Sequence, residues 1–467
     1  MTGFTVVRVR ELTNTTQRAR GDFSKGSVWK TVVAQAVPVM LAQMVQILYN
    51  VVDRVFIGHM PLNGSIALTG VGLAFPITTL IMAFTSLFSV GGTPLFAIAR
   101  GQKNEKRAET ILNQVTFQLI LSGIILFFIC YFFRKPILYL FGASDLSYPY
   151  ADAYLKIYLW GTVFTMFATG LNGFINAQGY PGIGMMTILL GAAMNIALDP
   201  IFIYTLDMGV SGAAAATIIS QGVSALWVLK FFLGKKTMYR FSLRKMLPQF
   251  SLIKDIVTLG IAGFIMQATT CANQIICNSA LMNYGGDIFV SVYVCMLSIR
   301  DVAALPMLSV TSGAQPVISY NYGARKYKRM KTAMKFSAAT VLIYAAAIWL
   351  MILAFPAQIL SVFSSDPTML ETGIPAVRIY FRMFVFMSFQ TMGQMTFTAL
   401  GCTKRAICFS LLRKVFIAIP LVLILPGLGY GVNGIFMAEP VSDVIGGLAS
   451  FITMYLTLYR KLPYEDM

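Results

Sequence analysis

Two aspartates interrupt apolar stretches of this sequence, where a charge is costly. Asp53 lies in LYNVVDRVFIG, and Asp199 lies in NIALDPIFIY. Asn195 precedes Asp199 by four residues, so the two side chains share one helix face. Thr217, in the next apolar stretch, adds a hydroxyl oxygen. Such oxygens suit a hard cation or a proton, and two carboxylates close together in a low dielectric do not both stay ionised.

The alternative is that each aspartate pairs with a lysine or arginine and only holds helices together. Arg54 adjoins Asp53, but neighbouring residues on a helix point about 100° apart. The apolar stretches around these residues hold no other basic side chain at the same depth. We therefore expect an ion-coupling site formed by Asp53, Asn195, Asp199 and Thr217, and structural pairing stays as the alternative.

A second group of charges lies further along the chain. Glu439 and Asp443 are four apart in AEPVSD, and Arg300 adjoins Asp301. Ionisable residues inside a membrane span cost at least about 2.5 kcal/mol each, so they are functional candidates by default. Arg300 could pair with one of the acids, and both a structural salt bridge and contacts with substrate or protons stay open. The possible substrate-cavity residues are Gln43, Gln267, Asn273, Asn278, Arg300, Asp301, Gln394, Glu439 and Asp443.

No catalytic or metal-binding set of residues is visible in the sequence. The six cysteines have no CxxC spacing and are interpreted as packing residues. His59 is the one histidine and lies at an outer helix end, so a histidine metal site cannot form and no Ser-His-Asp set is available. We predict a protein that is not an enzyme and has no cofactor, with H+ or Na+ as the ion at the oxygen cluster.

The elements that must position these residues are membrane-spanning helices. The 467 residues are 57% hydrophobic and only 12% charged, whereas a soluble domain carries about 25% charged residues. Apolar runs of roughly 20 residues recur, each long enough to cross about 30 Å of hydrocarbon. The runs do not alternate, which disfavours a β-barrel. We predict an all-α polytopic membrane protein with twelve transmembrane helices at 32–57, 66–90, 111–133, 153–176, 183–204, 210–233, 255–283, 288–312, 334–355, 376–400, 406–427 and 432–458.

The basic residues lie in alternate connections between these helices. Most of the 36 Lys and Arg residues fall in the N-terminal tail, 100–107, 230–254, 325–335, 404–414 and 460–461. The intervening connections at 59–65, 205–209, 284–287 and 428–431 have none. This positive-inside pattern places both termini in the cytoplasm. It also explains the net charge of +18 without a nucleic acid partner, and the basic loops are expected to contact anionic lipid.

The sequence contains an internal repeat with an offset of 222 residues. GGTPLFAIARGQKNEKRAETI resembles GAQPVISYNYGARKYKRMKTA, which pairs Pro94 with Pro316 and Arg107 with Arg329. GVSGAA and GVNGIF have the same separation. Each half has six helices, and both halves enter the membrane from the same side, so we expect two lobes that transport by rocking. The predicted segments are a tail at 1–30, an N-terminal lobe at 31–233, a loop at 234–254, a C-terminal lobe at 255–458 and a tail at 459–467.

The carboxylate cluster is not duplicated with the fold. The residues at the positions equivalent to Asn195, Asp199 and Thr217 are Ile417, Leu421 and Glu439. A purely structural pair has less reason to differ between the lobes, so this asymmetry favours a functional role for the N-terminal cluster.

Two prolines lie within the helices that carry the aspartates. Pro38 leaves the Ala34 carbonyl without a helical donor, and Pro200 does the same for Ile196. Such sites kink membrane helices. Each proline is interpreted as a static kink or as a moving hinge.

Four stretches resemble the multidrug and toxic compound extrusion (MATE) family: PVMLAQMVQILYNVVDRVFIG, NIALDPIFIY, GVSGAAAAT and GAQPVISYNYGARKYKR. The resemblance covers about residues 28 to 458 and is nearest to the bacterial DinF-like branch. It implies two six-helix lobes in the bacterial inner membrane and export of cationic or lipophilic compounds driven by inward H+ or Na+ flow. It also implies ion coupling by Asp53, Asn172, Asn195, Asp199 and Thr217, and a first-helix proline at Pro38.

The sequence differs from the other main bacterial branch of the family in one respect. The other main bacterial branch has acids in its seventh and tenth helices, where this sequence reads FIMQATT and SFQTMGQ.

A flippase for lipid-linked saccharides is the alternative function, disfavoured because Arg300 is the one clear mid-span cation. A membrane enzyme or receptor would need a catalytic set or a soluble domain. The expected partners are small-molecule substrates and membrane lipid, and the chain is expected to be a monomer.

Overall fold

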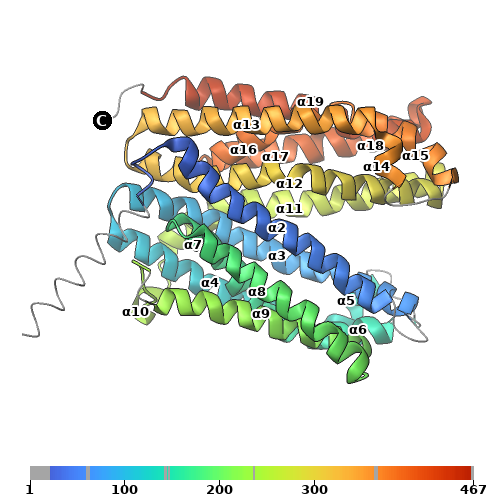
Figure 1. The fold of residues 1–467 in the computed structure, drawn as a ribbon, viewed down its shortest axis with the longest axis horizontal. Helices are drawn as coiled ribbons and strands as arrows, with labels where there is room; N and C mark the ends of the chain where they lie inside the picture. Colours follow the sequence, from blue (N-terminus) through green and yellow to red (C-terminus); the bar gives the residue numbers. More distant parts are fainter. Residues whose placement is uncertain are drawn as a thin grey trace, which may run out of the picture. The chain divides into compact units, whose positions relative to one another are not determined.

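The regular structure of the described residues is helical, with no strand among them. The computed structural model describes residues 22–58, 64–140, 145, 148–234, 237–361 and 367–463. His59 and the predicted tail up to residue 21 lie outside these ranges. The chain divides into two units (Figure 1): residues 22–25 and 38–260 form the first, and residues 26–37 and 261–463 form the second.

The first unit is a bundle of long helices in which α8 and α9 pack side by side (Figure 1). Its first helix begins in the second unit and enters the first at Pro38. Its elements are α2 (Val28–Gly58), α3 (Gly64–Gly101), α4 (Glu105–Phe132), α5 (Arg134–Leu140), α6 (Tyr148–Tyr158), η1 (Leu159–Gly161), α7 (Thr162–Ala177), α8 (Pro181–Pro200), η2 (Ile201–Thr205), α9 (Gly209–Leu233) and α10 (Leu243–Met246).

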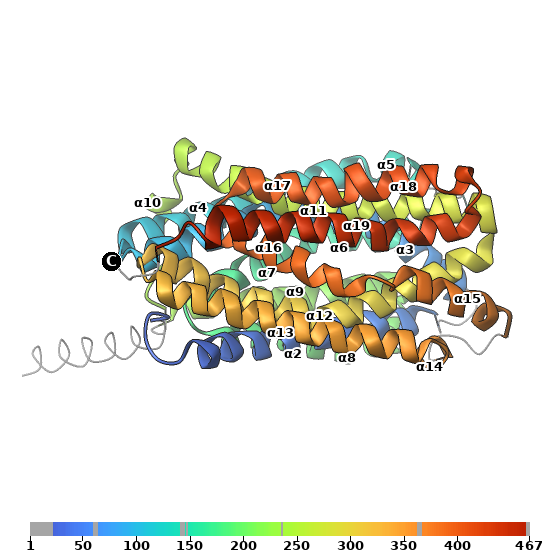
Figure 2. The same cartoon turned by 90° about the horizontal axis from the view of Figure 1, so that it is seen from above.

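The second unit is a bundle of the same kind, in which α16 and α19 pack side by side (Figure 2). Its first helix, α11, belongs to the first unit up to Gly260. Its elements are α11 (Phe250–Gly285), α12 (Asp287–Gly323), α13 (Tyr327–Ala354), α14 (Pro356–Ser361), α15 (Pro367–Tyr380), η3 (Phe384–Phe386), α16 (Met387–Ala399), α17 (Thr403–Leu411), η4 (Leu412–Ala418), α18 (Ile419–Ile424), η5 (Pro426–Leu428), α19 (Gly431–Met454) and η6 (Tyr455–Tyr459).

Among the described residues, 10 helices are long and apolar enough to cross a membrane. The two other predicted spans, 153–176 and 376–400, are each made of two helices joined by a 3-10 turn. They are α6–η1–α7 and α15–η3–α16. Together these account for the twelve predicted spans, and the all-α polytopic fold is confirmed.

Two helices extend well beyond their predicted ends. Helix α3 was expected to end at residue 90 and α12 at 312, but they continue to Gly101 and Gly323. The added turns are buried in protein, with Phe96 and Ile318 fully covered. The prediction stopped where the lipid-type apolar run stops, whereas these turns pack against neighbouring helices.

The backbone conformation repeats between the two halves at the same offset as the sequence. Residues with left-handed φ values recur at an offset of 222: Lys103 (57°) with Arg325 (55°), Gly179 (87°) with Gly401 (72°), and Gly209 (56°) with Gly431 (52°). Non-glycine residues rarely adopt this conformation. Lys103 and Arg325 therefore mark the same strained turn in both halves.

The predicted loop between the lobes is held tightly by the first unit. Gln114 on α4 donates to the carbonyls of Lys245 (2.8 Å) and Leu247 (2.6 Å) and accepts from the amide of Gln249 (3.2 Å). Asn113 accepts from the amide of Ser242 at 2.8 Å. These bonds engage four backbone groups between Ser242 and Gln249, so this segment is held on the α4 surface.

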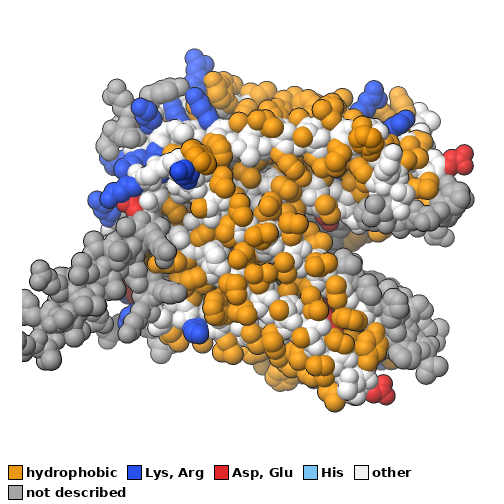
Figure 3. Space-filling view, viewed as in Figure 1, with side chains coloured by type: hydrophobic (Ala, Val, Ile, Leu, Met, Phe, Trp, Pro, Cys, Tyr) orange, Lys and Arg blue, Asp and Glu red, His pale blue; other side chains and the backbone are white. Residues whose placement is uncertain are grey.

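The visible faces of the helix bundles are apolar (Figure 3). Hydrophobic side chains cover the flanks of the helices, whereas Lys and Arg side chains gather mainly near helix ends. Exposed residues such as Phe128, Phe132, Ile343 and Leu423 belong to this surface. A surface of this kind suits a hydrocarbon solvent.

Candidate functional site

Asn195 and Asp199 form a buried polar pair on α8. Asn195 Nδ2 donates to Asp199 Oδ1 at 3.1 Å, which is the i to i+4 contact expected from the sequence. Asp199 is fully buried and Asn195 is 2% exposed. No donor among the described residues reaches Asn195 Oδ1 or Asp199 Oδ2. The pair thus presents two oxygens that are shielded from water.

Asp53 on α2 meets this pair. Its carboxyl group lies within hydrogen-bonding reach of Asp199 and interacts with it electrostatically. Because two ionised carboxylates have no hydrogen to donate, this contact becomes a hydrogen bond only when one of them carries a proton. Within the described part of the chain, no Lys or Arg forms an ion pair with Asp199. The structural-pairing alternative therefore does not hold for Asp199.

Three tyrosines that the sequence did not single out line the same cluster. Tyr49, one turn before Asp53 on α2, interacts electrostatically with both Asp53 and Asp199. Tyr154 stacks on Tyr158 with ring centroids 5.5 Å apart, and the hydroxyls of Tyr154 and Thr217 are in contact. The i to i+4 spacing of Tyr49 and Asp53 was a signal that could have found Tyr49, and no such signal marked Tyr154 or Tyr158.

Pro200 ends α8 and begins a change of helix type. The next residues, Ile201–Thr205, form π turns, in which Leu206 N bonds to Ile201 O at 2.8 Å. Tyr204 in this segment donates to the Phe56 carbonyl on α2 at 2.6 Å. The π segment thus links the helix of Asp199 to the helix of Asp53. Pro38 lies inside α2, which continues through it.

Asn172 is not brought into this cluster. Its Nδ2 donates to the Gly184 carbonyl at 3.2 Å, near the start of α8. Gly184 and Asp199 are 15 residues apart on one helix, which corresponds to roughly 22 Å at 1.5 Å per residue. The assignment of Asn172 to the ion-coupling set is corrected: it joins the C-terminal end of α7 to the start of α8.

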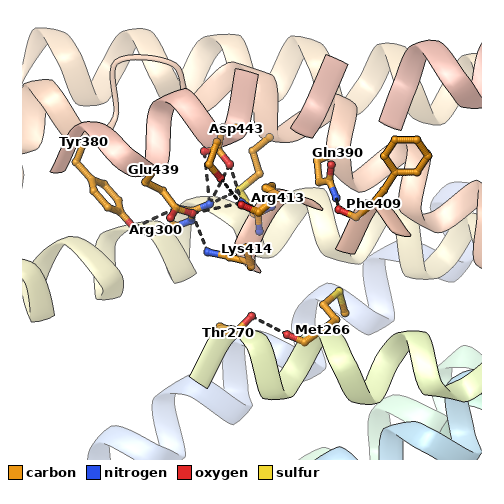
Figure 4. A network of polar contacts seen from close by, with 12 residues as sticks. Met266, Thr270, Arg300, Tyr380, Gln390, Phe409, Arg413, Lys414, Glu439 and Asp443 are labelled. Carbon is orange, nitrogen blue, oxygen red and sulfur yellow. Dashed lines mark hydrogen bonds and ion pairs between the residues drawn. The ribbon is translucent and has the colours of Figure 1, made fainter. Parts of the chain in front are cut away.

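The charges of the second unit form one buried network (Figure 4). Glu439 Oε1 accepts from Arg300, from Lys414 Nζ at 2.9 Å and from Arg413 Nη1 at 3.3 Å. Asp443 Oδ1 accepts from Arg413 Nη1 at 2.7 Å and from Arg300 Nη2 at 3.4 Å. Arg300 also donates to the Tyr380 hydroxyl at 3.0 Å. We call these six residues the α19 network.

Two members of the α19 network were missed in the sequence. Arg413 and Lys414 were counted with the basic residues of a cytosolic connection, but they lie in the π segment η4 and their side chains are 14% and 10% exposed. The short length of the apolar stretch was the signal in the sequence. The apolar residues from Val415 to Leu425 are too few to cross about 30 Å as a helix. The predicted span 406–427 already contained both cations, so counting them in the connection 404–414 was wrong.

Asp301 lies outside the α19 network although it adjoins Arg300. Its side chain is exposed, because neighbours on a helix point in different directions. Of the other possible cavity residues, Asn273 is buried, Gln43 and Asn278 are half-buried, and Gln267 is exposed. Gln394 donates to the Ala406 carbonyl at 3.1 Å, which is a helix-to-helix bond.

At equivalent helix contacts of the two units, the glycine and the larger residue that it faces have exchanged helices. In the first unit, a Cβ added at Gly191 would lie 2.5 Å from Ser224 Oγ. In the second unit, a Cβ added at Gly446 would lie 2.9 Å from Arg413 Cβ. Positions 191 and 413 are repeat equivalents, as are 224 and 446. Glycine at 446 therefore leaves the space in which the Arg413 stem reaches the α19 network.

Comparisons with known proteins agree with this architecture. The family model described as MatE matches residues 38–201 and 263–424. A multidrug export protein MepA of Staphylococcus saprophyticus is 25% identical over 434 residues, covering 93% of this chain and 95% of the relative. The MepA of Staphylococcus haemolyticus is 26% identical over 436 residues, covering 93% and 94%.

Solved structures share the fold. An outward-facing multidrug resistance MATE family transporter of the MOP superfamily has a TM-score of 0.86 at 23% identity, covering 94% of this chain and 97% of that one. A MATE crystal structure in the bent conformation has a TM-score of 0.88 at 23% identity, covering 94% and 98%. At this identity the likeness establishes the fold alone.

Proposed function

Because this chain belongs to the MATE family of multidrug transporters, we propose that it exports cationic or lipophilic compounds in exchange for H+ or Na+ across the bacterial inner membrane. The two lobes would give alternating access, with both termini in the cytoplasm. Asp53, Asn195, Asp199 and Thr217 would form the ion site. The multidrug export relatives from staphylococci support the substrate class.

One observation carries the ion site. Asp199 is fully buried and, within the described residues, has neither a basic partner nor a donor to its Oδ2. A buried ionised carboxylate in that state is costly unless it takes up a proton or a cation. The Asp53 carboxyl group lies within hydrogen-bonding reach, and a second ionised carboxylate there would add to this cost. The cluster therefore binds a positive species as a matter of charge balance.

The same oxygens fit both ions. A proton would bridge Asp53 and Asp199 as a carboxyl–carboxylate hydrogen bond. Na+ would be held by Asp199 Oδ2 and Asn195 Oδ1, the buried oxygens without a donor, with Asp53 and Thr217 as further oxygen ligands. The ion would neutralise the carboxylates after entering from one side of the membrane and would leave on the other side. This ion movement would drive substrate in the opposite direction.

The test is transport by the purified chain in proteoliposomes, with ethidium as substrate and an imposed gradient of either H+ or Na+. Asp53→Asn and Asp199→Asn should each reduce gradient-driven transport to the rate of protein-free liposomes, because an amide cannot cycle between charged and neutral forms. Ethidium binding should persist in both variants. The gradient that drives the wild-type chain identifies the ion.

Asp207→Asn is the matched control. Asp207 is exposed and has a left-handed φ of 49°, a conformation that asparagine tolerates as well as aspartate. This variant should transport at the wild-type rate. Wild-type driven transport in both Asp53→Asn and Asp199→Asn would refute the proposed ion site.

A lipid flippase remains the second candidate, and one reason against it needs correction. The α19 network holds three cations, Arg300, Arg413 and Lys414, rather than Arg300 alone. Glu439 and Asp443 occupy donors of all three, so only one positive charge is left over for an anionic headgroup. The multidrug exporter therefore stays the better-supported function, and a flippase would move fluorescent lipid in the same liposomes.

A further inference from the structure

The α19 network has one more positive charge than negative. Arg300, Arg413 and Lys414 face two carboxylates, Glu439 and Asp443. The side chains are only 2% to 14% exposed, so water cannot screen the excess. An uncompensated charge in this setting is strongly unfavourable. The network is electrically neutral only when one of the three cations gives up its proton.

Lys414 is the cation that can do so. Arginine stays protonated in proteins, whereas a buried lysine can become neutral. Lys414 Nζ has a single hydrogen-bond partner within the described residues, Glu439 Oε1 at 2.9 Å. If Lys414 becomes neutral, Glu439 still accepts from Arg300 and Arg413, and Asp443 keeps both arginines. No carboxylate is left without a cation.

The groups around Lys414 do not offer a substitute charge. Beyond the cations and acids named, the titratable side chains facing the α19 network are Cys277 on α11, Tyr293 on α12 and Tyr380 on α15. All three are neutral in their ordinary protonation states. Asp301 is exposed and not part of the network. The balance of charge is therefore set by Lys414.

The α19 network also occupies the repeat position of the N-terminal ion cluster. Glu439 is equivalent to Thr217 and Tyr380 to Tyr158, each 222 residues on. Both pairs belong to polar clusters in their own unit. The two lobes thus carry clusters of opposite charge at one place in the fold.

We propose that Lys414 is a second proton-carrying group of the transporter, and that it releases its proton when a cationic compound binds near the α19 network. A bound cation raises the energy of the charged lysine by like-charge repulsion. Proton and compound therefore exclude one another at this lobe. The exclusion rests on the proposed export of cations, whereas the proton site itself rests on the charge balance alone.

The test measures protons released when tetraphenylphosphonium binds to the purified full-length chain in weakly buffered solution with a pH dye. The experiment is run in Asp199→Asn, so that the N-terminal cluster does not contribute. Adding Lys414→Arg, which cannot deprotonate, should abolish the remaining release. Adding Lys414→Met, which has no proton to give, should abolish it as well.

The affinity for tetraphenylphosphonium separates a proton site from a structural role. A permanent charge in Lys414→Arg should weaken binding several-fold, and the neutral Lys414→Met should strengthen it several-fold and remove its pH dependence. A purely structural lysine would weaken binding in both variants, and that result overturns the proposal. Because the two variants have opposite expectations, a folding defect in one leaves the other decisive.

Lys331→Met is the matched control. Lys331 is a lysine of the same unit, 3% exposed, that donates to the Leu462 carbonyl at 2.8 Å and lies outside the α19 network. It should keep the full proton release. Full release in Lys414→Arg would overturn this inference and leave the Asp199 site standing. Wild-type driven transport in both Asp53→Asn and Asp199→Asn would refute the N-terminal ion site and leave the Lys414 inference standing.

Discussion

At the scale of single residues, Glu439 is the centre of the C-terminal charges. Its Oε1 accepts from three cations, whereas Lys414 has one partner. Losing the acid would leave three cations with one carboxylate. Losing the lysine would leave two cations with two carboxylates. These two substitutions should therefore have very different effects on stability.

We predict that Glu439→Gln lowers the free energy of unfolding by about 3–5 kcal/mol, the cost of breaking a buried ion pair from one side. Lys414→Met should leave the stability close to that of the wild-type chain or raise it, because it removes the excess charge. Thermal unfolding of the purified variants in detergent measures both.

The double variant Lys414→Met/Glu439→Gln provides the control. Its remaining charges are two cations and one acid, so it should be more stable than Glu439→Gln alone. Equal losses in the two single variants would show that the charge balance does not govern this site.

The residues of the N-terminal site were predictable, and those of the C-terminal site only in part. Asn195 and Asp199 were found because their spacing matches one helix face, and the bond between them is present. Arg413 and Lys414 were misplaced because positive-inside counting assigns basic residues near a helix end to the loop. Asn172 was assigned from the family resemblance alone, and its bond to the Gly184 carbonyl places it away from this cluster.

At the scale of elements, the π segments were beyond prediction. A π turn adds a single residue to a helix, so the hydrophobic pattern hardly changes. Yet η2 brings Tyr204 to Phe56, and η4 carries Arg413 and Lys414. Pro200 signalled a distortion but not its type. Whether Pro38 and Pro200 act as hinges stays a prediction.

The segment from Ser242 to Gln249 offers a prediction at this scale. Gln114→Leu removes three hydrogen bonds to its backbone, so the segment should leave the α4 surface more often. Cleavage by trypsin after Arg240 and Lys245 in the detergent-purified chain should then become several-fold faster.

Gln118→Leu is the matched control for this experiment. Gln118 lies one turn further along α4 and is 5% exposed, and neither side-chain polar atom has a partner among the described residues. Replacing such a group by an apolar one is neutral or stabilising. Unchanged cleavage in Gln114→Leu would mean that other contacts hold the segment.

At the scale of the whole molecule, twelve spans were predicted and found, but two of them are broken by 3-10 turns at Leu159–Gly161 and Phe384–Phe386. Hydropathy finds spans because every backbone polar group in lipid needs a helical partner. It does not report local breaks, because those are tolerated where neighbouring helices cover them. The repeat was found from residues matched at a fixed offset of 222, and the left-handed pairs Gly179 with Gly401 and Gly209 with Gly431 share that offset.

Topology can be tested in the intact cell. In a background without the six native cysteines, Asp207→Cys should react with a membrane-impermeant maleimide in whole cells. Lys106→Cys should react only after the membrane is opened. Both positions are exposed and lie at opposite ends of the first unit's helices. Labelling of Lys106→Cys in sealed cells would contradict the cytoplasmic placement of the basic connections.

The exchange of bulk between positions 413 and 446 constrains the history of the duplicated gene. If the ancestral half resembled the first unit, it had glycine at the 413 position and serine at the 446 position. An arginine could not enter opposite serine, because even a Cβ at 446 would lie 2.9 Å from Arg413 Cβ. The change from serine to glycine at the 446 position must then have come first, as a functionally neutral substitution. It later permitted a buried arginine at the 413 position.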